Sequence, residues 1–230
     1  MSKTIMAVGA HIGDAQLTCG MLLAKHAMAG DHIITVDLTA GERGTPKGYT
    51  PETWRPVNVA AAAEFAKTLG GESYVFDTPD GELYDTKEIE LQLARLMREK
   101  QVSEVLYHWP KSMHKDHIAA STITENAIFY ASLGTFELDG LKPAPIRRML
   151  FAENWEDSED FEPYIYFDVS EAFPLWKEAV CKLWLTEHSN DFKYLQYYEG
   201  LSRARGALIK AEHATAFAVH SYEKRIKGEI

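Results

Sequence analysis

The chain has 230 residues, of which 46% are hydrophobic and 11% aromatic, a length and composition typical of one folded domain rather than of a disordered chain. Acidic side chains outnumber basic ones by 34 to 24, giving a net charge of -10 without a basic stripe, so we expect no nucleic acid and no membrane as partner. No apolar run is long enough to span a bilayer and the N-terminus lacks the layout of a signal peptide, which favours a cytoplasmic protein. The two cysteines, Cys19 and Cys181, exclude a disulfide framework and a thiolate zinc site, so any metal must be held by histidines and carboxylates.

Short apolar segments alternate with helical patterns over the first 130 residues. Strands are expected at 4–10, 32–38, 73–76 and 102–108, followed by two more at 146–152 and 164–168. Helices are expected at 14–28, at 50–69 either continuous or broken near Pro56, at 85–100 behind a capping box of Asp85 and Glu88, within 114–132, and in most of the chain beyond Ser170. This alternation predicts an α/β fold, a three-layer Rossmann-like sandwich around a mostly parallel sheet, with ligands bound beyond the carboxyl ends of the strands.

Two groups of candidate metal ligands follow the first and fourth expected strands. His11 and Asp14 come directly after the first strand, and His114, Asp116 and His117 come shortly after the fourth. These strands are neighbours in the commonest order of such sheets, so the two groups are expected to converge at one point. Taken singly, each histidine is more typical of a hydrogen-bonded structural residue. Taken together, His11, Asp14 and His117 form the three-ligand set of a catalytic zinc site, with a water in the fourth position.

The motifs A-H-x-x-D, T-x-G-E-x-G and H-x-D-H, in this order, resemble those of the PIG-L/LmbE-like metal-dependent de-N-acetylases. The matching stretches are 10–44, 77–85 and 114–120, and weaker matches extend over nearly the whole chain. The resemblance therefore implies a single LmbE-like domain over residues 1–230. It also implies a hydrolase that removes acetyl groups from amino sugars or related amides.

The resemblance assigns a role to eight residues. It implies that His11, Asp14 and His117 bind one divalent metal ion, with zinc expected. His114 would stabilise the oxyanion or shuttle a proton, and Asp116 would support the neighbouring imidazoles as the second catalytic residue. The residues implied to contact or frame the substrate are Glu42, Arg55 and Asp80. For these three, a surface ion pair or a role in a turn is an equally good interpretation.

The opening motif departs from the family pattern A-H-P-D-D-x-E at several positions. Gly13 stands where the family has the aspartate that acts as general base, Gln16 replaces the usual glutamate, and Asn58 replaces a second glutamate. General-base catalysis is worth roughly a hundredfold to ten-thousandfold in rate, so the loss of this aspartate matters. Asp116, Glu42, Asp80, His114 or a carboxylate of the substrate are all candidates to replace it.

Three hypotheses follow. The first is a metal-dependent hydrolase that uses metal-activated water to cleave an N-acyl amide, with N-acetyl expected, of an amino sugar or related small molecule. The alternative is a catalytically silent metal-binding or ligand-binding member of the same family, because of Gly13. A third, a dinucleotide-binding protein, is weak because Gly9 and Gly13 lack the central glycine of the fingerprint. The aromatic residues of the C-terminal helices are also compatible with a homo-oligomer.

Overall fold

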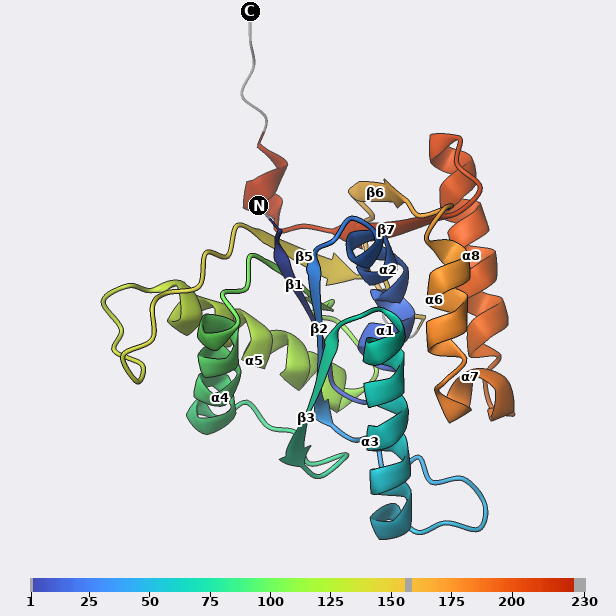
Figure 1. The fold of residues 1–230 in the computed structure, drawn as a ribbon, viewed down its shortest axis with the longest axis horizontal. Helices are drawn as coiled ribbons and strands as arrows, with labels where there is room; N and C mark the ends of the chain where they lie inside the picture. The colour runs from blue at the N-terminus through green and yellow to red at the C-terminus, as the bar shows by residue number, and fades with distance from the viewer. Residues whose placement is uncertain (1, 156–158, 226–230) are drawn as a thin grey trace, which may run out of the picture.

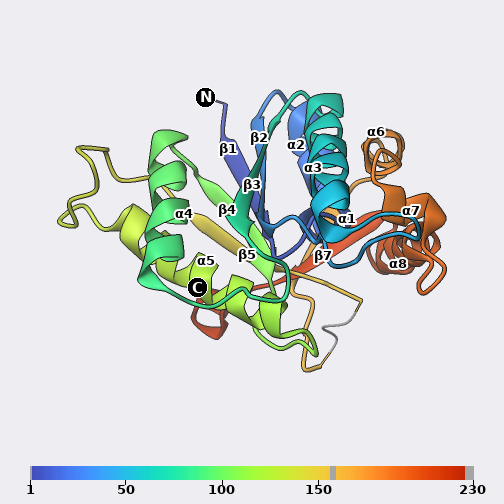
Figure 2. The same cartoon turned by 90° about the horizontal axis from the view of Figure 1, so that it is seen from below.

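A computed structural model describes residues 2–155 and 159–225, which form a seven-stranded sheet between two layers of helices (Figures 1 and 2). The strand order is β3-β2-β1-β4-β5-β7-β6. The first five strands in the chain pair in parallel, and β7 runs antiparallel to both β5 and β6. The strands are β1 (Thr4–Gly9), β2 (His32–Thr39), β3 (Glu72–Thr78), β4 (Glu104–His108), β5 (Arg148–Ala152), β6 (Ile165–Asp168) and β7 (Ala214–Ala218). The predicted α/β architecture is confirmed.

Two hydrophobic cores lie on the two faces of this sheet. In β1, Ile5 and Ala7 contribute to one core, while Met6 and Val8 contribute to the other, as the alternation of side chains along a strand requires. Helices α4 (Lys87–Glu99) and α5 (Lys115–Ser132) cover one face, as Figure 2 shows. The other face carries α1 (Asp14–Thr18), α2 (Gly20–Met28), α3 (Pro51–Thr68) and α6 (Phe173–Val180), with α7 (Trp184–His188) and α8 (Tyr194–Ile209) beside them. A short 3-10 helix, Ser221–Lys224, follows β7.

The helix predicted at 14–28 is two helices separated at Cys19, and the prediction was wrong there. The indole Nε1 of Trp176 donates to the backbone carbonyl of Gln16 at 3.0 Å, and a side-chain donor that takes a helix carbonyl interrupts the helical ladder. Gly20, the next residue after the break, packs so closely on Trp176 that a Cβ there would lie 2.6 Å from the ring. The break therefore depends on a residue 160 positions away, which no local pattern reveals.

Helix α3 passes through Pro56 without a break, which is one of the two forms that the sequence left open. Thr50 and Thr53 cap its start, and the proline removes only one donor. Two further details of the secondary structure differ from the prediction. The N-cap of α4 is Thr86, not Asp85, and the Asp85 carboxylate instead accepts a hydrogen bond from Asn126. Strand β7 lies in a segment predicted to be mainly helical, since its alanines favour helix locally. Within 2–155 and 159–225, every helix is too short or too polar to cross a bilayer.

Candidate active site

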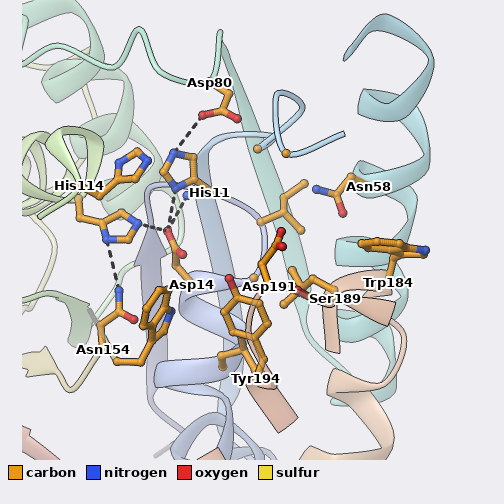
Figure 3. A pocket seen from close by; sticks show the side chains of 18 of the residues that line it. His11, Asp14, Asn58, Asp80, His114, Asn154, Trp184, Ser189, Asp191 and Tyr194 are labelled. Atoms are coloured by element: carbon orange, nitrogen blue, oxygen red, sulfur yellow. Dashed lines mark hydrogen bonds and ion pairs between the residues drawn. The ribbon is translucent and has the colours of Figure 1, made fainter. Parts of the chain in front are cut away.

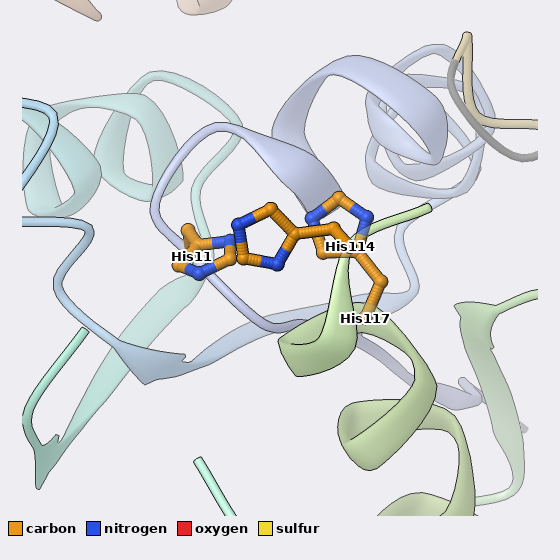
Figure 4. Close-up of side chains that lie close together, drawn as sticks. All are labelled: His11, His114 and His117. Carbon is orange, nitrogen blue, oxygen red and sulfur yellow. The ribbon is translucent and has the colours of Figure 1, made fainter. Parts of the chain in front are cut away.

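The two groups of polar residues do meet at the carboxyl ends of β1 and β4. These strands are direct neighbours, with Val8 paired to Tyr107. His11 lies in the turn between β1 and α1, Asp14 begins α1, and His117 lies in the first turn of α5. Figure 3 shows His11 and Asp14 directed toward one another at one end of a cavity, and Figure 4 shows His117 close to His11.

Two distances from Asp14 match those between neighbouring ligands of a tetrahedral metal ion. The Oδ2 atom of Asp14 lies 3.3 Å from Nδ1 of His11 and 3.4 Å from Nε2 of His117. Zinc bonds of 2.0–2.1 Å separate neighbouring ligand atoms of a tetrahedron by about 3.3–3.4 Å. His11, Asp14 and His117 are also hard or borderline ligands of the kind that Zn²⁺ and related divalent ions prefer. This cluster of histidines and aspartate could therefore hold a metal ion.

The charge state of Asp14 suits the same role. Burial alone would raise the pKa of Asp14, but the charge of His117 and hydrogen bonds with His108 and His11 hold it well below the usual range. The backbone N–H of His11 also donates to Oδ2 at 2.8 Å. Asp14 is therefore an anion at neutral pH, as a metal ligand must be.

The second nitrogen of His11 is bracketed by carboxylates. Its Nε2 lies 3.2 Å from Oδ1 of Asp80 and 3.3 Å from Oδ2 of Asp116. Asp116 is fully buried, and its Oδ2 also accepts the N–H of Gly81 at 2.7 Å. A carboxylate on the far nitrogen of a metal-binding histidine fixes the ring and strengthens the bond to the metal. Asp80 and Asp116 are therefore placed behind His11, on the side away from Asp14.

Among the described residues, three triplets of side chains have ligand atoms that all lie within 4.8 Å of one another. The first is His11, His114 and His117, drawn in Figure 4, the second is Asp14, His108 and His117, and the third is His11, Asp80 and Asp116. The second is disfavoured by the position of His108. Its Nε2, the nitrogen that faces Asp14 at 3.2 Å, also lies 3.1 Å from the backbone N–H of Ala10, and accepting that bond would use its lone pair. The sequence indicated only that His108 ends a strand.

His114 is held with one nitrogen facing its own helix. It is the N-cap of α5, and its Nδ1 accepts the N–H of Asp116 at 3.2 Å. A neutral ring in this arrangement carries its hydrogen on Nε2. Burial, together with the positive charges of His11 and His117, lowers the pKa of His114 below its usual value. The ring is therefore neutral at neutral pH and can donate a hydrogen bond through Nε2.

The backbone at Gly13 is adapted to glycine. Its φ of +120° is a conformation that side chains rarely permit, and a Cβ at this position would lie 2.7 Å from Cδ2 of Leu185. Removal of the aspartate side chain has therefore not left an empty space beside the cluster, because Leu185 from α7 fills it.

Gly13→Ala is expected to destabilise the protein by about 2–4 kcal/mol, through the unfavourable φ and the overlap with Leu185. Urea unfolding of Gly13→Ala, Leu185→Ala and the double variant measures this. The double variant should cost less than the sum of the single ones, because removing Leu185 relieves the overlap. Equal stability of Gly13→Ala and the wild type would contradict this account.

Hydrogen bonds explain why positions 16 and 58 carry amide side chains where the family has glutamates. The Nε2 atom of Gln16 donates to both carboxylate oxygens of Asp37, at 2.9 and 3.2 Å, while its Oε1 accepts the N–H of Gly13 at 2.8 Å. Asn58 donates from Nδ2 to the carbonyl of Ala40 at 2.7 Å. An ionised glutamate could not donate either bond. These departures from the family motif are therefore matched to acceptors beside them.

Asp37 gives a prediction for the dependence of stability on pH. Burial raises the pKa of Asp37 well above its usual range, against the two hydrogen bonds from Gln16. Because the folded pKa lies above the unfolded one, the stability that Asp37 contributes is lost as pH rises through the folded pKa. Asp37→Asn should therefore gain stability relative to the wild type as pH rises above the usual pKa of an aspartate, by up to about 1.4 kcal/mol per pH unit in the titration range.

Urea unfolding at several pH values, with chelator present, measures this difference. Asp168→Asn serves as the matched control, because hydrogen bonds from Ser170 lower the pKa of Asp168 and it does not titrate in this range. A constant difference between Asp37→Asn and the wild type would show that Asp37 is ionised throughout.

The cluster opens into a cavity of about 370 Å³. Five of the eight predicted site residues line it: His11, Asp14, Asp80, His114 and His117. Asp116 lies behind His11. Glu42 accepts a hydrogen bond from the backbone N–H of Asp80 at 3.0 Å and forms an ion pair with Arg55 at 3.4 Å. The substrate-contacting role of Glu42 and Arg55 stays a prediction, since both lie behind Asp80 rather than in the wall.

The opposite wall of the cavity comes from the C-terminal part of the chain. Sequence reasoning expected Trp184, Tyr194 and Tyr198 to lie in the core or at a subunit contact and assigned no role to the others. Helix α8 packs against α1, and α7 packs against α8, which brings these residues to the cavity. Members of this wall are Trp155, Trp184, Leu185, Ser189, Asp191, Tyr194 and Tyr198, together with Asn154, which lies at its edge beside His117.

Comparison with known protein families identifies the family of this chain. The model of the PIG-L family, described as GlcNAc-PI de-N-acetylase, matches residues 6–128, and the chain belongs to this family. The resemblance drawn from the sequence is thereby confirmed.

Three solved structures share the fold. The conserved protein TT1542 from Thermus thermophilus is 26% identical with a TM-score of 0.80, and the match covers 94% of each chain. The N,N'-diacetylchitobiose deacetylase from Pyrococcus horikoshii is 20% identical with a TM-score of 0.81, over 94% of this chain and 83% of that one. GalB, the 4-carboxy-2-hydroxymuconate hydratase from Pseudomonas putida KT2440, is 21% identical with a TM-score of 0.87, over 99% of each chain.

Proposed function

We propose that the protein is a metal-dependent hydrolase that cleaves an N-acyl amide, with N-acetyl as the expected acyl group, of an amino sugar or related small molecule. The observation that carries the proposal is that Oδ2 of Asp14 lies 3.3 Å from Nδ1 of His11 and 3.4 Å from Nε2 of His117, which are separations between neighbouring ligands of a tetrahedral ion. Membership of a de-N-acetylase family and the shared fold of a sugar deacetylase support it.

Each residue around the cluster has a distinct role in the proposed reaction. A divalent ion held by His11, Asp14 and His117, with zinc expected, would lower the pKa of a water and polarise the acyl carbonyl. Nδ1 of His117 lies 3.3 Å from Oγ of Ser112 and 3.3 Å from the side-chain amide of Asn154, and these two contacts orient the ring so that Nε2 faces Asp14. Asp116 and Asp80 hold the ring of His11 from the other side.

His114 is the group that faces the reacting atoms. Its Nε2–H can donate a hydrogen bond to the acyl oxygen as negative charge develops there. Its Nδ1 already accepts the N–H of Asp116, so the neutral ring offers no lone pair for a base. Among the carboxylates considered as a replacement base, Asp80 and Asp116 face the far nitrogen of His11, and Glu42 is engaged by Asp80 and Arg55. We infer that His114 stabilises the oxyanion and does not replace the base that position 13 lacks.

Two measurements on the wild-type protein test the proposal. Elemental analysis of protein purified without chelator should find about one divalent metal ion per chain. A panel of N-acetylated sugars and N-acyl amines should include substrates that release acetate or the free acid. Absence of both metal and hydrolysis would refute the proposal.

The second candidate is a catalytically silent member of the family that binds metal or ligand. Gly13, with Leu185 packed where a side chain would lie, is the observation that favours it. Metal in the purified protein and calorimetric binding of a panel member, without turnover of any, would establish it. Hydrolysis that disappears in a variant lacking one ligand would exclude it.

A further inference from the structure

The wall of the cavity opposite the metal cluster has its own chemistry. It is built on residues 154–198, and the family model ends at residue 128, so the family match says nothing of what this wall binds. A substrate held with its acyl group at the cluster would extend its amine-bearing part against this wall. The contacts of this wall would therefore determine which amine the site prefers.

Aromatic side chains line this wall. Trp54 from α3 and Trp184 from α7 meet edge to face, with ring centroids 5.9 Å apart, so two layers of the fold join at the cavity. Trp54 is almost fully buried, whereas Trp184 keeps 36% of its surface exposed although it lines the cavity. Tyr194 adds a third ring near them (Figure 3). Flat aromatic surfaces at a cavity mouth favour a flat, weakly polar ring of a ligand.

The charged groups of the cavity are of one sign. Beyond the histidines and Asp14, the charged residues that line it are Asp80 and Asp191, and no lysine or arginine is present in its wall among the described residues. Asp80 is engaged by His11. The carboxylate of Asp191 points into the cavity in Figure 3, and it takes part in no hydrogen bond or ion pair within residues 2–155 and 159–225.

The nearest cationic side chains are turned to other partners. Lys193 donates to the backbone carbonyl of Ser189 at 3.1 Å, and Arg55 is shared between Glu42 and Asp77. An anionic group in this half of the cavity would therefore meet Asp191 without a compensating cation, while an ammonium group would find an unpaired carboxylate. Aromatic faces nearby also attract cations.

We infer that the substrate is an N-acylated amine carrying a flat ring and a second, positively charged amine, with the ring against Trp184 and the ammonium group at Asp191. This rests on the proposed function for the position of the acyl group. It excludes carboxylated substrates such as the 4-carboxy-2-hydroxymuconate of the hydratase that shares the fold.

Three matched compounds test the inference. They are N-acetylbenzylamines that carry an aminomethyl, a methyl or a carboxyl group at the para position, so that only the charge of the substituent changes. Binding to the metal-loaded protein is measured by calorimetry, independently of hydrolysis. The wild type should bind the ammonium compound about tenfold more tightly than the carboxylate, with the neutral compound between them.

Variants locate the origin of the preference. Asp191→Asn should weaken the ammonium compound about fivefold and leave the neutral one unchanged, and Asp191→Lys should reverse the order of the two charged compounds. Glu178→Gln, which removes one exposed charge on α6 away from the cavity, is the matched control and should change nothing. Trp184→Ala should weaken all three compounds equally. The charge preference should also shrink with added salt.

The outcomes separate this inference from the proposed function. Equal binding of the three compounds, tighter binding of the carboxylate, or an unchanged order in Asp191→Asn would overturn the inference even if N-acyl compounds are hydrolysed. Binding in the expected order, without hydrolysis of these compounds or of any member of the panel above, would uphold the inference about the wall and favour the catalytically silent alternative over the hydrolase.

Discussion

His117→Ala should lose both the bound metal and measurable hydrolysis while the protein stays folded. The ring of His117 supplies the donor atom 3.4 Å from Asp14, and only His11 and Asp14 would remain of the three proposed ligands. Loss of a residue that merely supports a ligand weakens metal binding by about 10–100-fold, so loss of a ligand itself should exceed about a hundredfold. The metal content after dialysis, measured with the hydrolysis rate, checks this.

His32→Ala is the matched control for this variant. It removes one imidazole at the start of β2, at the opposite end of the sheet from the cluster. Metal content and rate should stay at the wild-type level, which shows that the effect at position 117 is local. Full metal occupancy in His117→Ala would place the metal elsewhere, and the triplet of ligands proposed here would be wrong.

His114→Asn should lower kcat/KM by about a hundredfold to a thousandfold with the metal retained. The imidazole that would donate to the acyl oxygen is removed, and one hydrogen-bond donor to a developing oxyanion contributes about this much. Asparagine is itself a good N-cap residue, so the start of α5 keeps an acceptor for the N–H of Asp116. The variant thus separates the chemistry of His114 from its structural part.

Elemental analysis, thermal unfolding and the separate values of kcat and KM distinguish the two parts. We expect unchanged metal content and stability, with the loss mainly in kcat, because the bond strengthens as the transition state forms. A loss confined to KM would make His114 a substrate-binding residue. A rate like that of the wild type would remove it from the mechanism.

The approach of the two ligand groups could be predicted because it depends on strand order alone. His11 and Asp14 follow β1, and His114 and His117 follow β4, and parallel neighbours deliver their carboxyl ends to one edge. The metal site could be recognised because the candidate ligands stand only a few residues apart within each group. The fold class followed from the alternation of strands and helices for the same reason.

The rest depends on contacts between distant segments. The break at Cys19 needs Trp176, the conformation of Gly13 is fitted to Leu185, and neither is visible in a local pattern. Strand β7 is mostly alanine, which is not typical of strands, and it is held in the sheet by antiparallel pairing with both β5 and β6. The wall with Trp184 and Asp191 is likewise assembled by tertiary packing, so residue spacing gave no signal for it.

The turn that presents His11 and Asp14 leans on the far end of the chain. Trp176 donates a hydrogen bond to the carbonyl of Gln16, and Leu185 packs over Gly13, so α6 and α7 fix the conformation of the loop after β1. A fragment that ends at the boundary of the family match would contain His11, Asp14 and His117 but would lack these two contacts. Possession of the ligands is thus separable from their alignment, and the catalytic geometry belongs to the assembled molecule.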